Sequence, residues 1–301
     1  FAGAPQTPEE IYAAARAGSP PVFDLPVTAR LRVTSRHAAF ESVNILALLP
    51  GSDARLAAEA VVVTAHLDHL GLCPPVDGDP VCHGAYDNAS GVATLLEIAR
   101  VLAGRSPAPR RSILFAVVTG EEKGLLGSDY LAHHPIRDLE VVADVNIDGA
   151  PGILYPIADV VALGVEHSTL RGPVEAAARA AGYLLSPDPM PEESFFVRSD
   201  QYSFVRRGIP SVCLTDGGKS TVPGVDGLAR SRAWLTTLYH TPKDSIDQPF
   251  DFASAAKGAG LNLDLVERVA AADARPAWNP GDFFGTRFGA ARRSGGTAGK
   301  N

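Results

Sequence analysis

Short apolar runs that alternate with helical patterns constrain the fold of this chain most. Residues 43–49, 61–65, 113–118 and 141–147 are apolar and have the length of strands in a sheet interior. Segments of helical periodicity separate them, so strands and helices alternate along the chain. This alternation predicts an α/β fold, a mostly parallel mixed sheet flanked by helices on both faces.

Helical patterns fill the intervals between these runs. Helices are expected at residues 125–133, 169–181 and 254–272, and a further strand at residues 30–34. The segment Thr7-Pro8-Glu9-Glu10 predicts a helix start, because it offers a capping side chain, a proline at the first position and a glutamate at the third. Another helix follows residue 91, and its apolar stripe, which should pack on the sheet, consists of Val92, Leu95, Leu96, Ala99 and Leu102.

Polar residues that can bind metals lie where the predicted strands run out into loops. The carboxyl ends of parallel strands meet at one edge of a sheet, which is where α/β sheets bind their ligands. Histidine and carboxylate side chains are the donors expected in a hydrolytic zinc site, and Glu121 is a spare carboxylate beside one of them. The five candidate metal ligands are His66, Asp87, Glu122, Asp148 and His240.

A pair of metal ions would account for this set of ligands. Two zinc ions about 3.5–4 Å apart need a shared carboxylate, further histidine and carboxylate ligands, and an open position for water. We assign Asp87 as the bridge, because small residues at 89–91 let the backbone approach the ions. Manganese or cobalt would fit a similar site. The other ligands form two pairs, His66 with Asp148 and Glu122 with His240.

Three further residues have expected roles around the ions. Glu121 is free to act as general base, because its side chain diverges from that of Glu122. Asp68 would accept the spare imidazole N–H of His66 and so fix the tautomer that binds metal. Tyr239 would donate its hydroxyl to the developing oxyanion.

Short motifs around these residues run through most of the chain. They are Ala65-His66-Leu67-Asp68-His69, Gly84-Ala85-Tyr86-Asp87-Asn88-Ala89-Ser90-Gly91, Gly120-Glu121-Glu122-Lys123-Gly124-Leu125-Leu126-Gly127-Ser128, Asn146-Ile147-Asp148-Gly149, Ser199-Asp200, Gly208-Ile209-Pro210 and Tyr239-His240-Thr241-Pro242-Lys243-Asp244. In this order they resemble the motifs of the family M28 metallopeptidases, the co-catalytic zinc aminopeptidases and their relatives. The resemblance implies the zinc exopeptidase (phosphorylase/hydrolase-like) fold, two zinc ions bridged by Asp87, Glu121 as catalytic base, and hydrolysis of a peptide or small amide.

The resemblance leaves several reactions open on one fold. We expect an exopeptidase, most of all an aminopeptidase that hydrolyses N-terminal residues through a water activated by two zinc ions. A carboxypeptidase or dipeptidase, a glutaminyl cyclase and a noncatalytic binding module are the alternatives. Glutaminyl cyclases resemble the family but work with one zinc, so the complete ligand set favours hydrolysis. One position departs from the pattern: many relatives carry His after the Ser-Asp pair, where this chain has Gln201, which leaves the substrate side of the pocket open.

Other polar residues have less specific interpretations. His69 and His83 flank ligands, and could line the pocket or lie on surface loops. Asp200 is expected to be a structural hydrogen-bonding residue. Arg198 could contact substrate or belong to a solvated loop.

Composition excludes two classes of partner. The 301 residues carry a formal net charge of -7 without a basic cluster, which argues against binding of nucleic acid. No apolar run approaches the length of a membrane span. A peptide or small-amide substrate is the expected partner, and the sequence does not specify the oligomeric state.

Composition also divides the chain into three parts. Residues 1–40 resemble the end of a protease-associated insertion that some relatives carry, and residues 41–275 form the expected catalytic domain. Residues 276–301 are rich in Gly, Arg and Ser and are expected to be a partly disordered tail. The chain begins with Phe1 instead of Met, so we expect a processed or excised product. A removed signal peptide would make it a secreted or periplasmic protein.

The cysteines also concern whether the protein is exported from the cytosol. Cys73 and Cys82 bracket a Pro/Gly/Asp-rich loop between His66 and Asp87. A disulfide there would clamp the loop over the metals and agree with export, whereas two free cysteines in a cytosolic loop are the alternative. Cys213 lies in an apolar run and is expected to be buried.

Overall fold

The computed structural model describes residues 3–134, 136 and 139–294, with the backbone alone described at 290–294. The chain divides into two compact units, residues 1–41 and 42–301. In the first, α1 (Pro8–Arg16) begins as predicted, since Glu10 N–H donates to the Thr7 hydroxyl (3.3 Å) and Thr7 N–H donates to Glu10 Oε2 (2.8 Å). The strand expected at residues 30–34 is wrong, because this segment has no regular structure. Alternation of side chains does not supply the neighbouring strand that a sheet needs.

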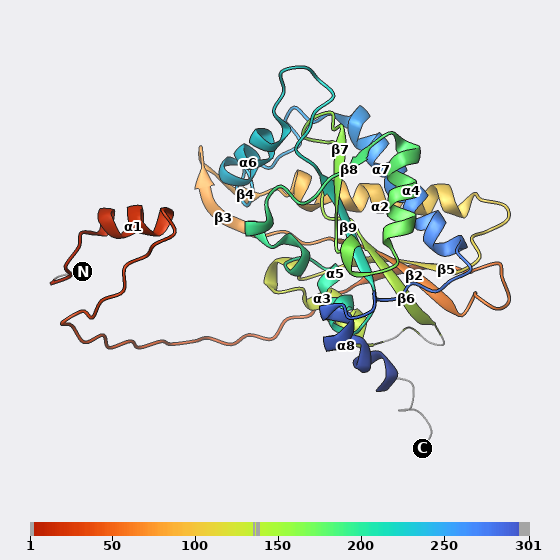
Figure 1. The fold of residues 1–301 in the computed structure, drawn as a ribbon, viewed down its shortest axis with the longest axis horizontal. Helices are drawn as coiled ribbons and strands as arrows, with labels where there is room; N and C mark the ends of the chain where they lie inside the picture. The colour runs from red at the N-terminus through yellow and green to blue at the C-terminus, as the bar shows by residue number, and fades with distance from the viewer. Residues whose placement is uncertain (1–2, 135, 137–138, 295–301) are drawn as a thin grey trace. The chain divides into compact units, whose positions relative to one another are not determined.

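The second unit is built on a seven-stranded mixed sheet, seen in Figure 1. The strand order is β1-β5-β2-β6-β9-β7-β8, and β5, β2, β6 and β9 are parallel neighbours. β1 pairs antiparallel with β5, and β7 antiparallel with β9 but parallel with β8. The predicted α/β fold is therefore confirmed. The strands are β1 (Ile45–Leu49), β2 (Glu59–His66), β5 (Ser112–Val118), β6 (Glu140–Asn146), β7 (Asp159–Leu163), β8 (Leu184–Leu185) and β9 (Ser211–Asp216).

Helices cover both faces of the sheet. One face carries α2 (Gly91–Ala103), α4 (Arg171–Ala181) and α7 (Phe252–Ala271), and the other carries α3 (Leu126–His133), α5 (Gln201–Arg206) and α8 (Phe283–Ser294), as Figure 1 shows. α6 (Gly227–Thr237) lies between β9 and the loop of His240 in the chain. None of the described helices is long and apolar enough to cross a membrane.

The central strand β2 explains why this fold was legible in the sequence. Val61, Val63 and Ala65 are fully buried in the core cluster under α2 and α7, while Val62 is fully buried in the cluster under α3 and α5. A strand that is buried on both faces reads as a continuous apolar run.

Some apolar side chains that were expected to be buried, in β1 and on α2, are exposed. β1 is the edge strand of the sheet, and its Ile45, Leu46 and Leu48 are 41–54% exposed. On α2, Leu96 is 58% exposed, and Ile98 is buried against the sheet in its place. In both cases the side chains are apolar like those of a core. Whether another helix or strand covers them depends on the tertiary structure.

Much of the C-terminal segment, which was expected to be partly disordered, has regular structure. Residues 283–294 form α8, and Asp282 precedes it, with Oδ1 accepting from Phe284 N–H at 2.8 Å and Oδ2 bonded to His167 Nδ1 at 2.7 Å. Trp278 donates its indole N–H to the Gly208 carbonyl at 2.9 Å. Aromatic residues among the glycines thus dock this segment on the domain. Residues 295–301 lie outside the described part of the chain.

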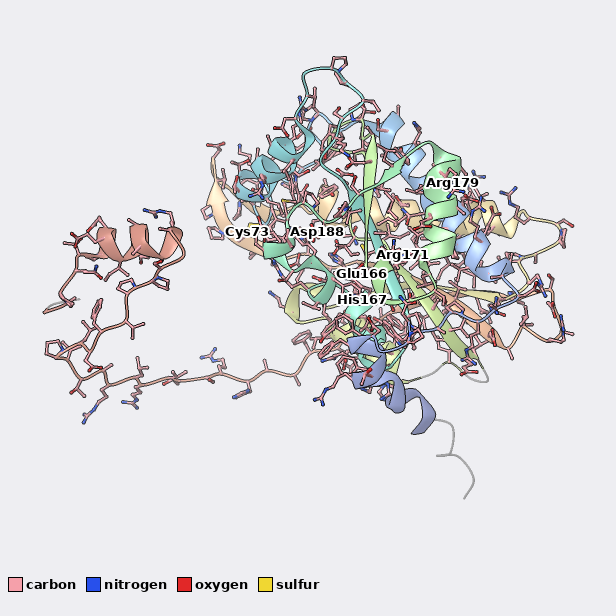
Figure 2. The ribbon with its side chains drawn as sticks, in the orientation of Figure 1. Cys73, Glu166, His167, Arg171, Arg179 and Asp188 are labelled. Atoms are coloured by element: carbon pink, nitrogen blue, oxygen red, sulfur yellow. A yellow bond between two sulfur atoms is a disulfide. The ribbon has the colours of Figure 1, made fainter. Side chains whose placement is uncertain are left out.

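A separate hairpin of β3 (Gly71–Val76) and β4 (Asp79–Cys82) carries the predicted disulfide. Cys73, labelled in Figure 2, is bonded to Cys82 with a Cα–Cα distance of 5.9 Å, which confirms the prediction. Near the tip of the hairpin, Asp77 forms an ion pair with Lys243, which follows His240 closely in the chain. Cys213 is buried in β9, as expected.

Candidate metal centre

The predicted ligands meet at the carboxyl edge of the parallel strands. His66 is the last residue of β2, Glu122 lies in the turn that follows β5, and Asp148 follows the end of β6. β5, β2 and β6 are neighbours in the sheet and run parallel, so their carboxyl ends bring these side chains together.

Asp87 lies at the centre of the cluster. Its Oδ1 is 3.2 Å from His66 Nε2, and its Oδ2 is 3.3 Å from His240 Nε2. Asp148 Oδ1 lies 3.5 Å from the same His66 nitrogen, and Glu122 Oε2 lies 3.1 Å from the same His240 nitrogen. The two oxygens of Asp87 therefore face two separate groups of ligands, as those of a bridging carboxylate would.

His69 also belongs to the cluster, although the sequence left it open between pocket and surface. Its Nδ1 is 2.8 Å from Glu122 Oε1 and 3.8 Å from Asp87 Oδ2, and its side chain is 8% exposed. His69 and His240 thus flank the same carboxylate. Among the described residues, two sets of potential ligand atoms lie within 4.8 Å of one another: His66 with Asp87 and Asp148, and His69 with Asp87 and Glu122.

The buried polar atoms of the cluster fit bound cations. Nε2 of His66, Nε2 of His240 and Oε1 of Glu122 are buried and have no hydrogen-bond partner among the described residues. Nitrogens and carboxylate oxygens that face one another without hydrogen bonds keep their lone pairs free for a metal ion. Histidine and carboxylate donors together suit zinc.

His66 is held in the tautomer that presents Nε2 to the carboxylates. Its Nδ1 donates to the backbone carbonyl of Asp68 at 3.0 Å. The expected contact with the Asp68 carboxylate is wrong, because the chain turns just after β2 and brings the carbonyl to the ring. The Asp68 carboxylate instead accepts from the Glu121 backbone N–H at 3.2 Å. Asp68 therefore supports both a ligand and the candidate base.

Two buried side chains hold the loop of Asp87. Asp244 accepts from the Asp87 N–H at 3.0 Å through Oδ2. Asn88 donates to the carbonyl before Asp148 at 2.9 Å and accepts from the N–H after it, also at 2.9 Å. Asn88 thereby joins two ligand segments that are far apart in the sequence. Both residues stand in the motifs of the sequence, but the sequence assigned them no role.

Asp148 is fixed from behind by a chain of hydrogen bonds. Ser199 donates to Asp148 Oδ2 at 2.6 Å, and Asn146 donates to Ser199 Oγ at 2.8 Å and to Gln201 Oε1 at 2.7 Å. Gln201 is fully buried and donates to the carbonyl of Phe196 at 2.9 Å. The departure from the family pattern at Gln201 therefore lies behind the ligand cluster and does not line the substrate side.

The adjacent residues Glu121 and Glu122 differ in their affinity for a proton. Burial, and then the negative charge of Asp148, raises the pKa of Glu121 to about 9. Burial alone would also raise the pKa of Glu122, but His240 and His69 outweigh it and lower this pKa to about 2. Glu122 is thus an anion suited to binding metal, whereas Glu121 has the affinity of a group that takes up protons.

The loop of His240 has an uncommon backbone conformation. His240 has φ 56°, in the left-handed region that residues other than glycine rarely adopt. The Tyr239 ring stacks on the His240 ring with centroids 3.7 Å apart, and Tyr239 N–H donates to the Trp234 carbonyl at 3.0 Å. Burial raises the pKa of Tyr239, so its hydroxyl is a neutral hydrogen-bond donor.

A cavity of about 130 Å³ opens beside the cluster. Asp87, Glu121, Asp148 and Tyr239 line it on the side of the metal ligands. An apolar cavity of about 150 Å³ holds a benzene molecule, so this one has the scale of a single side chain. The rest of the lining is largely apolar and includes Leu154, Leu163, Met190, Phe195, Trp234 and Leu235.

The other polar candidates from the sequence lie in different surroundings. Asp200 is fully buried, and burial raises its pKa to about 7. Arg198 lines the cavity with a half-exposed side chain and donates to the Glu193 carbonyl at 2.9 Å. His83 is exposed and pairs with Asp79 at 2.8 Å.

A mixed α/β sheet with histidines and carboxylates gathered at its carboxyl edge defines a class of metal-dependent hydrolases. The sequence narrows this class. The model of Peptidase family M28 matches residues 44–266, so the chain belongs to this family of metallopeptidases.

Known proteins agree with this family and fold. A vacuolar membrane protease of Yarrowia lipolytica is 25% identical over 234 residues, which cover 76% of this chain and 20% of that protein. The structure of BSAP, a zinc aminopeptidase from Bacillus subtilis, has a TM-score of 0.53 at 24% identity, covering 74% of this chain and 49% of that chain. A glutaminyl cyclase from Bacteroides thetaiotaomicron, bound to N-acetylhistamine, has a TM-score of 0.54 at 19% identity, covering 74% and 76%. The chain spans about a fifth of the curated relative.

Proposed function

We propose that the chain is a metal-dependent exopeptidase, an aminopeptidase that removes N-terminal residues from peptides with two zinc ions that share Asp87. Bound ions would polarise the scissile carbonyl and lower the pKa of a water molecule. One observation carries the proposal: the carboxyl group of Glu121 lines the same cavity as Asp87 and Asp148 but belongs to neither set of ligands.

The residues around the cavity then have separate tasks. Glu121 takes a proton from the attacking water and delivers it to the leaving amine. Tyr239 donates its hydroxyl to the oxyanion that forms on the substrate. Asp68 holds the backbone of Glu121, and Ser199 holds Asp148, so the base and a ligand keep their places during the reaction.

Removal of terminal residues is supported by the size of the cavity. Its volume of about 130 Å³ accommodates one side chain next to the candidate base, as a pocket for the terminal residue of a peptide would. The fold is shared with a protein named a zinc aminopeptidase, which supports the amino end as the one recognised.

Adjacent substitutions at Glu121 and Glu122 test the proposal. Glu121→Gln keeps the shape but cannot take up the proton, so turnover should fall by about 10²–10⁴-fold while metal content stays at two. Glu122→Gln should lose metal as well as activity, because a neutral amide is a poorer ligand than a carboxylate. Turnover of aminoacyl, carboxyl-terminal and blocked peptides would be measured with elemental analysis of the same samples. Glu97→Gln, an exposed glutamate on α2, is the control.

Three outcomes would contradict the assignment. Near-normal turnover by Glu121→Gln, or loss of metal from it but not from Glu122→Gln, would show that the two roles are wrong. Cyclisation of N-terminal glutamine without peptide hydrolysis, with one zinc per chain, would favour the glutaminyl cyclase reaction of the structural neighbour.

We also propose that the protein works outside the reducing cytosol. The bond between Cys73 and Cys82 supports this, since disulfides persist in oxidising compartments. Mass spectrometry of protein from its native source, without reductant, should find a peptide pair joined at these residues. Freely alkylated thiols there would contradict an exported protein.

A further inference from the structure

The cavity beside the metal cluster contains a buried carboxyl group that the proposed chemistry does not use. Asp216 is the last residue of β9, the parallel neighbour of β6, so it reaches the same edge of the sheet as the metal ligands. It lines the cavity together with Asp87, Glu121 and Asp148, and it is 8% exposed. Asp216 therefore shares a cavity with the candidate base.

Asp216 has one oxygen in use and one without a partner. Oδ1 accepts from the Gly152 N–H at 2.7 Å. Oδ2 is buried and has no hydrogen-bond partner among the described residues. Lysine and arginine form no ion pair with Asp216 anywhere in the described part of the chain. Buried carboxylates are almost always paired, so an unpartnered buried oxygen on a residue that lines the cavity is a candidate partner for a ligand group.

The charge around Asp216 is negative. Burial, and to a smaller extent the nearby Asp159, raises the pKa of Asp216 to about 7, and Asp159 itself lies 3.9 Å from the ammonium group of Lys219. Asp188, labelled in Figure 2, also lines the cavity and accepts from the Met190 N–H at 2.8 Å. Arg198 is the one cationic side chain in the lining among the described residues, and it is half-exposed and bonded to Glu193. A ligand group that binds beside Asp216 therefore lies near carboxyl groups, and no cationic side chain in the described lining is paired with Asp216.

The walls of the cavity suit an apolar stem. Besides its carboxyl groups, the lining includes several aliphatic and aromatic side chains, among them Leu154, Leu163, Met190, Phe195 and Leu235. Lysine and arginine have this combination of an apolar stem and a charged end.

We propose that the cavity holds the first side chain of the substrate and selects lysine or arginine, with Asp216 as the partner of the cationic end. The proposal rests on the aminopeptidase function above. It makes Asp216 a specificity-determining residue that contacts the substrate but takes no part in bond cleavage.

A carboxamide side chain is the competing occupant. The indole N–H of Trp234 is also buried and finds no partner in the described part of the chain, so glutamine could donate to Asp216 and accept from Trp234. Glutamine carries no charge, however, and would give the ionised form of Asp216 no counter-ion. The charges therefore favour the cation, and glutamine becomes an outcome of the test.

Binding of free amino acids to the zinc-loaded protein tests the proposal. Lysine and norleucine share the stem and differ in the ammonium group, so their ratio of affinities in calorimetry isolates the contribution of the cation. We expect the wild-type protein to bind lysine and arginine at least about 10-fold more tightly than norleucine or glutamine, the scale of a desolvated charge pair. Asp216→Asn keeps an oxygen for Gly152 but removes the charge, and should bring the ratio of lysine to norleucine to one or below. Norleucine should bind the variant as tightly as the wild type.

The control and the contradicting results are separate from those of the peptidase proposal. Asp264→Asn removes an acid on α7 that pairs with Arg268 and should leave every affinity unchanged. Equal wild-type affinities for lysine and norleucine, tightest binding of glutamine, no binding of any of the four, or an unchanged ratio in Asp216→Asn would each overturn the proposal. The wild-type panel alone decides if the variant does not fold. Free amino acids are not hydrolysed, so their binding is measured independently of peptidase activity. A preference for lysine without peptidase activity would refute the aminopeptidase function but support Asp216 as the partner of the lysine side chain. Peptide turnover without a preference for lysine would support the aminopeptidase function but refute this role of Asp216.

Discussion

The metal cluster and the cavity beside it are both acidic, and both lie at the carboxyl edge of the same parallel strands. Their carboxylates are nevertheless in opposite situations. In the cluster, the oxygens of Asp87 face imidazole nitrogens of His66 and His240 at 3.2 and 3.3 Å. In the cavity, Oδ2 of Asp216 faces no hydrogen-bond donor among the described residues. In the metal cluster the carboxylates thus face histidine side chains of the protein, whereas in the cavity one carboxyl oxygen of Asp216 has no partner among the described residues.

The pKa values of His240 and Asp216 reflect the charges around each of them. Burial lowers the pKa of His240, but Asp87 and Glu122 outweigh it and raise this pKa to about 9, because they stabilise positive charge in the cluster. Burial, and then the negative charge of Asp159, raises the pKa of Asp216 to about 7. Both regions of the metal-free protein therefore favour the uptake of positive charge.

Removal of the shared ligand would break the cluster and should have the largest effect. Asp87→Ala should lose both metal ions together and reduce turnover by more than the about 10²–10⁴-fold expected for a general base. Elemental analysis and turnover on the same sample would measure this, with the exposed Asp247→Ala as control. One ion retained at full occupancy would contradict a bridging role for Asp87.

The two histidines beside Glu122 should separate by metal content. His240 Nε2 lies 3.3 Å from Asp87 and 3.1 Å from Glu122, the position of a ligand to an ion held between the two carboxylates. His69 Nδ1 is closer to Glu122, at 2.8 Å, and farther from Asp87, at 3.8 Å, so it lies less evenly between the two carboxylates than His240 does. His240→Ala should therefore lose one ion. His69→Ala should keep both and weaken metal affinity by about 10–100-fold. The opposite pattern in metal titrations would exchange the two roles.

Asp216→Asn should change how the free energy of unfolding depends on pH, and so test whether Asp216 lacks the compensation that Asp87 has. The ordinary pKa of an aspartate is 3.8, and that of Asp216 in the folded protein is raised to about 7. The folded state then binds the proton more tightly, so the free energy of unfolding of the wild type falls as pH rises from about 4 to 7 and is constant above. The variant cannot titrate at this position. Its stability relative to wild type should rise across this window by about 1–4 kcal/mol.

Urea denaturation of the metal-free protein at several pH values would measure this difference. Asp264→Asn, on α7 outside the cavity, is the matched substitution for comparison. A pH-independent difference for Asp216→Asn would show that the carboxyl group is already compensated in the folded protein.

The disulfide hairpin should contribute least to the cluster. The bond joins residues separated by 9 positions in the sequence, so its loss should reduce the free energy of unfolding by at most about 2–3 kcal/mol. Cys73→Ser with Cys82→Ser should keep both metal ions and most of the turnover. Asp77→Asn, which removes the ion pair with Lys243, tests the other attachment of the hairpin. Loss of a metal ion from the double variant would show that the hairpin positions His240.

The sequence by itself determined the sheet and the residues that gather at its edge. Runs such as 61–65 are buried on both faces, so their composition alone identifies them as central parallel strands. Parallel strands end at one edge, which brings His66, Glu122 and Asp148 together without knowledge of any side-chain contact. Asp216 follows an apolar run in the same way, and this was the one signal that could have located it.

Only the tertiary structure decided which neighbours each of these side chains meets. It placed His69 against Glu122, gave His66 the carbonyl of Asp68 instead of its carboxylate, and docked α8 through aromatic residues in a segment that is rich in glycine. Above all, it left one oxygen of Asp216 without a partner. Periodicity reports which residues lie on a face or at a strand end, whereas the pairing of a buried charge depends on atoms from distant segments that come together only when the chain is folded.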